Sequence, residues 1–335
     1  MTSILALTQG DPAGVGPEIL LKLLLDSPEP PGWRPLLVAE RAALEALQPV
    51  LPSFPWDRLR YFAAPPSREE GAAGGIPVLD PVGSRRSVTF GSSGPADAGG
   101  AMAALDAGIS LVRSGAADAL VTAPVSKVSI ARQHLPGFTG HTDYLAAACG
   151  LERYGRDYLM AFLAPELQVA LLNVHLPLRA ALDGITAEAV GEALDCLYRH
   201  AGGRIALAGL NPHAGEDGLL GHEDQQVLAP AAAAARDRGA DVRGPESADS
   251  LFARARHGEF DWVLALYHDQ GLIAVKTAAF GLATNWTLGL PFLRTSVDHG
   301  TAFPIAGRGV AAAAPLAAVV ETTLKLIAGE LPRRG

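Results

Sequence analysis

Residues 4–18 of the chain, ILALTQGDPAGVGPE, contain a short apolar run, a glycine-rich turn and the start of a helix. Pro17 suits the first position of a helix, and Glu18 places a negative charge where the helix dipole favours one. A strand that leads through a turn into a helix is a building unit of α/β folds. The glycine spacing matches neither GxGxxG nor GxxxxGK[ST]. The turn is therefore either a ligand-binding loop or a simple break between strand and helix.

The same alternation continues along the chain. Short apolar runs typical of buried strands occupy residues 4–7, 35–38, 119–121, 169–174, 205–210 and 262–267. Longer segments with helical periodicity occupy residues 99–113, 187–200, 223–238 and 315–328. Strands that alternate with helices predict an α/β fold with a mostly parallel central sheet flanked by helices.

The composition indicates a globular protein without a nucleic-acid partner. The chain has 335 residues, of which 49% are hydrophobic and 19% charged, which excludes a disordered chain. A net charge of −8 repels polyanions. Cys149 and Cys196 lack the spacing of a disulfide framework or a thiolate metal site, and no segment suits a signal peptide or a membrane helix. We therefore expect a cytoplasmic protein that does not bind membranes.

Three histidines follow apolar runs at the ends of predicted strands. They are His175 in LLNVHLP, His213 in LAGLNPHAG and His268 in VLALYHDQG. Open α/β sheets bind ligands at the carboxyl ends of their strands. Three imidazoles gathered there would bind a divalent metal and leave one coordination position open, and zinc, nickel, cobalt or manganese would suit them. The alternative is that each histidine caps its own strand end.

The remaining candidates bind anions. His141 and Thr142 follow Gly140 at a predicted helix start, where they would contact an anion or Thr142 would simply cap the helix. Lys276 and Arg294 are isolated cations near Asn285 in a largely apolar stretch, and burial of either charge requires an anionic partner. That partner is either an aspartate, Asp269 or Asp298, or a bound phosphate or carboxylate. No GxSxG, HExxH or kinase motif supports nucleophilic catalysis.

Five blocks of the sequence resemble the 4-hydroxythreonine-4-phosphate dehydrogenase family of pyridoxal 5'-phosphate biosynthesis. These blocks are residues 8–18, 140–143, 210–216, 267–271 and 287–302. The resemblance implies a two-domain fold like that of isocitrate and isopropylmalate dehydrogenases, and a homodimer with shared active sites. Residues 1–135 and 300–335 would form one lobe. Residues 136–299 would form a second lobe with the dimer interface, and the active site would lie in the cleft between the lobes.

The same resemblance implies roles for individual residues. The metal ligands would be His175, His213 and His268, one of them contributed across the dimer interface. The substrate contacts would be His141, Thr142, Lys276, Asn285 and Arg294. Asp249 and Asp269 would support the site, whereas neither a catalytic proton acceptor nor a cofactor-binding residue is assigned. The metal would be Zn²⁺, or alternatively Mg²⁺, Co²⁺, Mn²⁺ or Ni²⁺.

The implied reaction is oxidation of 4-phosphooxy-L-threonine at C3 by NAD or NADP, followed by decarboxylation to 3-amino-2-oxopropyl phosphate. Three positions depart from the family pattern, namely Asp143, Trp286 and the pair Ser126-Lys127. Because Trp286 adjoins Asn285, a related substrate such as 4-phosphothreonate or 4-phosphoerythronate is an alternative. A metallohydrolase, in which the three imidazoles activate water, is an alternative of another class, and a phosphate-binding protein without turnover is a third.

Overall fold

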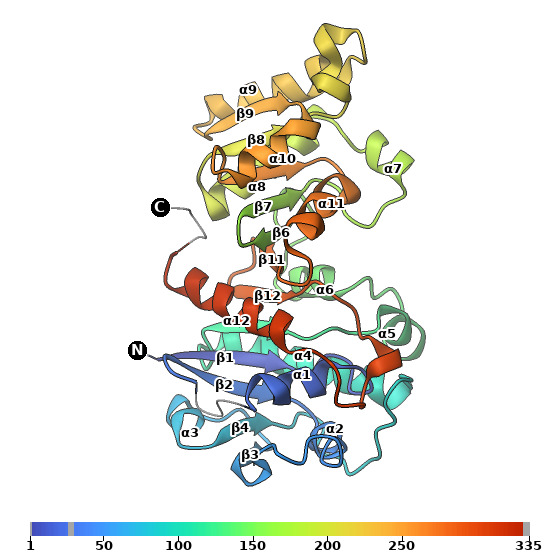
Figure 1. Cartoon of the computed structure of the whole chain (residues 1–335), viewed down its shortest axis with the longest axis vertical. Coiled ribbons are helices and arrows are strands. Elements are labelled where there is room, and N and C mark those ends of the chain that lie inside the picture. The colour runs from blue at the N-terminus through green and yellow to red at the C-terminus, as the bar shows by residue number, and fades with distance from the viewer. Residues whose placement is uncertain (1, 26–29, 331–335) are drawn as a thin grey trace. The chain divides into compact units, whose positions relative to one another are not determined.

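The computed structural model describes residues 2–25 and 30–330, which fold into two α/β units (Figure 1). The first unit contains the chain up to Leu145 together with Phe292–Ala328, and the second contains Ala146–Pro291. The sequence analysis placed these divisions near residues 135 and 300. The last strand, β12 (Leu293–Val297), pairs with β5 (Ala119–Thr122) and so belongs to the first unit. Residues 331–335 lie outside the described part of the chain.

The first unit is built on six strands whose pairs are all parallel. Their order is β3-β4-β2-β1-β5-β12. Besides β5 and β12, the strands are β1 (Ser3–Thr8), β2 (Trp33–Val38), β3 (Leu59–Phe62) and β4 (Ile76–Leu79). In register, Leu5 pairs with both Pro35 and Ala119. All six carboxyl ends therefore lie along one edge of the sheet, where α/β proteins bind ligands.

Helices cover both faces of this sheet. They are α1 (Gly16–Leu23), α2 (Arg41–Glu45), α3 (Arg68–Ala72), α4 (Pro95–Arg113), α5 (Lys127–Gln133) and α12 (Ala314–Ile327), with short 3-10 turns at Trp56–Arg58 and Phe303–Ile305. Helix α6 (His141–Ala148) begins in this unit. Leu5 and Leu7 of β1 share a buried core with α1 and α12. The side chains of Thr8 and Leu120 instead lie against Gly108 of α4, since successive strand residues point to opposite faces.

The second unit contains a mixed sheet in the order β11-β6-β7-β10-β8-β9. Its strands are β6 (Leu159–Ala164), β7 (Leu167–Leu171), β8 (Ile205–Ala208), β9 (Val242–Glu246), β10 (Trp262–Ala265) and β11 (Thr284–Leu288). Strand β6 is antiparallel to β7 and β11, whereas β7, β10, β8 and β9 are parallel. The carboxyl ends of β7, β10 and β8 consequently lie at the same edge.

Helices flank this sheet as well (Figure 1). They are α7 (Leu178–Asp183), α8 (Ala187–Ala201), α9 (Ala229–Asp237), α10 (Ala248–Arg256) and α11 (His268–Ala279), with irregular helical turns at Pro212–Gly218 and Asp224–Leu228. Leu251 of α10 and Leu272 of α11 join Val169 and Val263 in one buried core. The α/β class and the mostly parallel sheet predicted from the sequence are confirmed. No helix among the described residues is long and apolar enough to span a membrane.

Two glycines of the loop after β1 are required by the protein's own packing. Gly10 has a φ of 68°, and a Cβ there would collide with the carbonyl oxygen of Pro124. A Cβ on Gly16 would collide with the carbonyl oxygen of Gln9. The loop is further fixed because the amide of Val15 donates to the carbonyl of Thr301 at 3.0 Å. Close packing within the first unit thus accounts for both glycines without a ligand.

The substitution Gly16→Ala is therefore expected to lower the free energy of unfolding by about 2–4 kcal/mol, because backbone must move to admit the methyl group. Urea denaturation of the full chain measures this loss. Gly71→Ala is the matched control, because a Cβ at Gly71 in α3 meets nothing within 4 Å. Alanine favours a helix over glycine by up to about 1 kcal/mol, so this control should not lower the free energy of unfolding. Equal midpoints for Gly16→Ala and the wild type would contradict this account of the loop.

Candidate functional site

The three predicted metal ligands follow three parallel strands of the second unit. His175 follows β7, His213 follows β8, and His268 opens α11 after β10. The rings of His175 and His268 are neighbours, with centroids 5.6 Å apart. Among the described residues of one chain, however, no three His, Cys, Asp or Glu side chains gather closely enough to hold a metal ion. One chain therefore brings together two of the three imidazoles.

Each of the two predicted supporting aspartates is associated with one of these histidines. Asp269 Oδ1 lies 2.7 Å from Nδ1 of His268, which orients the ring and leaves Nε2 free for a ligand. Asp249 interacts electrostatically with His213. The Ser247 hydroxyl donates to Asp249 Oδ1 at 2.7 Å, and this hydrogen bond holds the pKa of Asp249 below its ordinary value. The structure therefore places a carboxylate next to His268 and another near His213.

Side-chain amides link the three strand ends that carry the histidines. Asn173 donates from Nδ2 to the carbonyl of Leu266 at 3.1 Å, which joins the ends of β7 and β10. Gln270 accepts from the amide of Leu266 at 2.7 Å and donates to the carbonyl of Gly209 at 2.8 Å, which joins the ends of β10 and β8. The sequence analysis did not identify Asn173 or Gln270. Both lie two residues from a histidine, and that short spacing is the signal that marks them.

The backbone at His213 has an unusual conformation. Six consecutive residues, from His213 to Gly218, have φ between 44° and 90°. Two of them, Gly215 and Gly218, are glycines, and a left-handed conformation costs the other residues roughly 1–2 kcal/mol each. Such strain persists only where surrounding contacts hold it, and it is concentrated at functional sites. The turn projects His213 and its neighbours onto the surface, where His213 is exposed.

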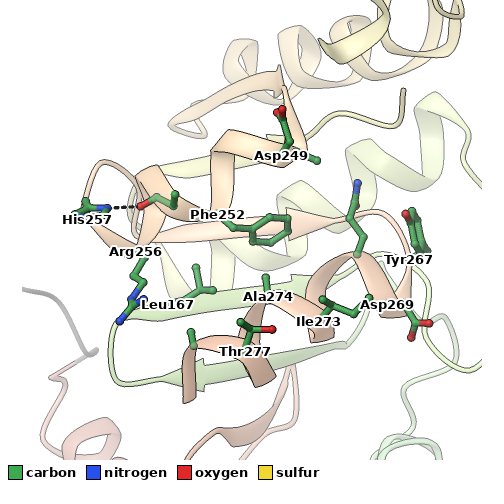
Figure 2. A pocket seen from close by; sticks show the side chains of 14 residues that line it. Leu167, Asp249, Phe252, Arg256, His257, Tyr267, Asp269, Ile273, Ala274 and Thr277 are labelled. Atoms are coloured by element: carbon green, nitrogen blue, oxygen red, sulfur yellow. Dashed lines mark hydrogen bonds between the residues drawn. The ribbon is translucent and has the colours of Figure 1, made fainter. Parts of the chain in front are cut away.

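An apolar groove of about 600 Å³ lies beside these residues in the second unit, between α10 and α11. Figure 2 shows Phe252 and Ile273 in the groove, with Asp249 and Asp269 contributed by the first turns of the two helices. Ile273 is 65% exposed. A largely apolar surface of this kind next to two carboxylates marks an interaction site.

The first unit contains a separate cluster of basic side chains. Arg294, on β12, is 1% exposed and donates from Nη2 to the Thr122 hydroxyl at 2.6 Å. His141 opens α6, and its pKa lies well below the ordinary value because the surrounding protein desolvates it, with further contributions from Arg294 and Lys127. The cluster favours a neutral imidazole beside two cations, an arrangement that attracts an anion.

Lys127, which the sequence analysis noted only as a departure from the family pattern, belongs to this cluster. A Cβ on Gly140 would lie 2.9 Å from Cε of Lys127, so the lysine stem runs against the backbone just before His141. Thr142 is buried and lies inside α6, one residue past its start, so it is not the helix cap that one interpretation required.

Lys276 and Asn285 lie in the second unit. Lys276 was selected from the sequence because its charge was expected to be buried, and this expectation was wrong. The helix period turns Leu272 and Val275 into the core and leaves Lys276 exposed. Asn285 lies on β11, and its Oδ1 is buried without a hydrogen-bond partner among the described residues. That acceptor is available to a bound ligand.

The side chains of Asn285 and Trp286, which are neighbours in the sequence, do not share a face of β11. Successive residues of β11 point to opposite faces, so the Trp286 ring lies away from the Asn285 side chain. The ring instead packs against the buried Trp262, with centroids 6.3 Å apart. The half-buried Trp286 ring thus has a packing partner within the second unit.

The pKa of His141 predicts a pH dependence of stability. Because the folded protein resists a proton that the unfolded chain accepts below about pH 6.5, the free energy of unfolding should fall as the pH drops from 6.5 toward the lower folded pKa. The free energy of unfolding of the wild type, minus that of His141→Gln, should fall by up to about 1.4 kcal/mol for each pH unit in that window. Urea denaturation at pH 7.5, 6.5 and 5.5 measures it. A difference independent of pH would exclude this role of His141.

Comparison with known proteins places the whole chain in one family. A family model described as "Pyridoxal phosphate biosynthetic protein PdxA" matches residues 33–323. The chain is 42% identical to the 4-hydroxythreonine-4-phosphate dehydrogenase of Acidithiobacillus ferrooxidans, over 96% of each chain. It resembles the crystal structure of that enzyme from Klebsiella pneumoniae with a TM-score of 0.85 and 32% identity, over 97% of this chain and 99% of the other.

A more distant solved structure is a terephthalate 1,2-cis-dihydrodiol dehydrogenase from Burkholderia xenovorans. It is 27% identical, with a TM-score of 0.61 and 97% coverage of both chains. The family model covers the motif at residues 287–302, and the relatives match nearly the full length of the chain, including both α/β units. The protein therefore belongs to the PdxA family of pyridoxal phosphate biosynthetic proteins.

Proposed function

We propose that this protein is an NAD(P)-dependent dehydrogenase of pyridoxal phosphate biosynthesis. It oxidises the C3 hydroxyl of 4-phosphooxy-L-threonine, and the resulting β-keto acid loses CO2 to give 3-amino-2-oxopropyl phosphate. The observation that carries the proposal is the identity of 42%, across 96% of both chains, with a relative named for this activity. The basic cluster of the first unit and the strand-end histidines of the second supply chemistry that such a substrate requires.

The first unit would bind the phosphate. Arg294 offers a buried guanidinium whose planar fork suits phosphate oxygens, and the fixed geometry reduces the entropy lost on binding. Lys127 adds a second positive charge, while His141 remains neutral and donates or accepts one hydrogen bond. Thr142 contributes a hydroxyl. From the second unit, Lys276 and the unpartnered Oδ1 of Asn285 would contact the substrate's remaining polar groups.

The second unit would hold a divalent metal through its three imidazoles. The donor set fits in part, because His175 and His268 are adjacent and Asp269 fixes Nδ1 of His268 so that Nε2 is available. When bound, a divalent cation lowers the pKa of a coordinated hydroxyl and polarises a carbonyl. Imidazole nitrogens favour Zn²⁺, with Co²⁺, Mn²⁺, Ni²⁺ or Mg²⁺ as alternatives.

A second copy of the chain would complete this metal site. Within one described chain no three ligand side chains gather, while His175 and His213 are exposed at the surface. The groove between α10 and α11 lies beside Asp249 and Asp269 and exposes Ile273. We therefore propose a homodimer in which the partner covers this groove and supplies one imidazole. We further propose that the enzyme acts in the cytoplasm, where thiols such as those of Cys149 and Cys196 stay reduced.

The substrate assignment is tested by a panel of phosphorylated acids. The purified protein is incubated with Zn²⁺, with NAD or NADP, and with 4-phosphooxy-L-threonine, 4-phosphothreonate or 4-phosphoerythronate, and absorbance at the reduced-cofactor band is followed. The proposal predicts the highest kcat/KM for 4-phosphooxy-L-threonine. A higher value for either sugar acid would move the assignment to that substrate, and no reduction of either cofactor by any of the three would refute the dehydrogenase activity.

A further inference from the structure

The turn that carries His213 is fastened by a buried carboxylate, Asp224, which lies thirteen residues after Asn211. Asp224 is fully buried, with 0% exposure. Its Oδ1 accepts from the amide of Leu210 at 2.8 Å, and its Oδ2 accepts from the amide of Asn211 at 3.1 Å. These two amides are the last backbone donors before Pro212, which has none. A single carboxylate therefore satisfies the backbone at the point where the left-handed turn begins.

A third hydrogen bond reinforces the same connection. The Asn211 side chain donates from Nδ2 to Asp224 Oδ2 at 2.9 Å and to Glu223 Oε2 at 2.8 Å. The turn also packs closely on this carboxylate, because a Cβ on Gly215 would lie 3.5 Å from Asp224. Asp224 thus hydrogen-bonds to the backbone at the entry to the turn and lies near Gly215 in its middle.

We infer that Asp224 is a positioning residue that holds the His213 imidazole where the bound metal requires it. The inference rests on the proposed function in so far as His213 is a metal ligand. Asp224 itself is buried behind the turn and acts through the backbone of Leu210 and Asn211. The strained conformation of residues 213–217 explains why such a fastening is needed: without it, the turn would relax toward ordinary backbone angles and carry His213 with it.

The test compares Asp224→Asn with the wild type and with Asp237→Asn, an exposed carboxylate on α9. Asparagine keeps the volume of aspartate but replaces one of its accepting oxygens with an N–H2 group, so at least one of the three hydrogen bonds is lost and a buried donor then faces another donor. The first readout is amide hydrogen exchange of residues 209–221 in the metal-free full chain. The second is the Zn²⁺ dissociation constant, measured by competition with a chromogenic chelator.

For Asp224→Asn we expect exchange in residues 209–221 to accelerate at least about tenfold and Zn²⁺ affinity to fall roughly 10- to 100-fold, the range found when a group that orients a metal ligand is removed. Asp237→Asn should match the wild type. A variant with a lower melting temperature but unchanged exchange and unchanged Zn²⁺ affinity would overturn the inference, because Asp224 would then only stabilise the unit.

Two further outcomes are distinguishable. If the wild type binds no Zn²⁺, the proposed metal site fails, and unchanged exchange in Asp224→Asn would separately refute the fastening of the turn. If Asp224→Asn does not fold, Asn211→Ala replaces it, since this change removes the side-chain bonds to Asp224 and Glu223 and keeps both backbone donors to Asp224. A smaller change in the same direction is then expected, and no change in either readout would refute the inference.

Discussion

Replacing His213 with alanine is expected to abolish tight Zn²⁺ binding and to lower kcat/KM by roughly a thousandfold or more, with little change in stability. The expected loss corresponds to about 4 kcal/mol, within the several kcal/mol that a metal ion supplies to charge development at an oxygen. His213 is exposed, so its removal creates no cavity and the fold should remain intact. Metal content of the purified protein and steady-state kinetics provide the measurements.

His200→Ala is the matched control for this substitution. His200 is exposed in the last turn of α8 and has no proposed role in binding. Its variant should retain the metal content and kcat/KM of the wild type. Full activity of His213→Ala after exhaustive chelation would eliminate His213 as a ligand of a catalytically required metal.

Replacing Arg294 with methionine is expected to reduce kcat/KM about 10²- to 10³-fold and, at the same time, to leave stability unchanged or higher. The guanidinium is the most buried cation of the basic cluster, and loss of a desolvated charge contact costs about 3–4 kcal/mol in binding. Burial also lowers the pKa of Arg294, so the folded state bears a cost for its charge that methionine removes. Arg294→Met should therefore lower kcat/KM while its urea midpoint stays the same or rises.

Two variants sharpen the measurement at Arg294. Arg294→Lys retains a positive charge without the fork and should recover part of the lost kcat/KM, mainly through KM. Arg199→Met, on the exposed surface of α8, should leave both kinetics and stability near wild type. If Arg294→Met loses stability but keeps its kcat/KM, the residue has a structural role and does not bind the phosphate.

The strands were predictable from apolar runs only in part, because the uniformly apolar β4 and β6 lie outside the predicted runs. The predicted runs overlap strands β1, β2, β5, β8 and β10. These strands are mostly apolar because a parallel sheet that helices cover on both faces leaves few polar positions. Strand β9 was missed because its sequence, VRGPE, contains a glycine and a proline, which an edge strand tolerates. Strand β11 was missed because its sequence, TNWTL, contains polar and aromatic residues and so does not form an apolar run.

The site was predictable only in its local signals. Histidines after apolar runs identified three strand ends, but nothing in the sequence indicated that the non-glycine residues His213, Ala214, Glu216 and Asp217 adopt left-handed φ. The carboxylate that holds this turn, Asp224, is thirteen residues from Asn211 and lies in an otherwise ordinary polar segment. Burial of Lys276 was misjudged because an apolar stretch was read without its helical period, which places this residue on the exposed face.

The reaction balance tests the central claim most directly. With 4-phosphooxy-L-threonine as substrate, NAD(P)H, CO2 and inorganic phosphate are measured in the same reaction. A dehydrogenase of a phosphorylated β-hydroxy acid should form one reduced cofactor and one CO2 for each substrate consumed, and no inorganic phosphate. Release of phosphate without cofactor reduction would show that the basic cluster and the histidines serve hydrolysis, and would contradict the account.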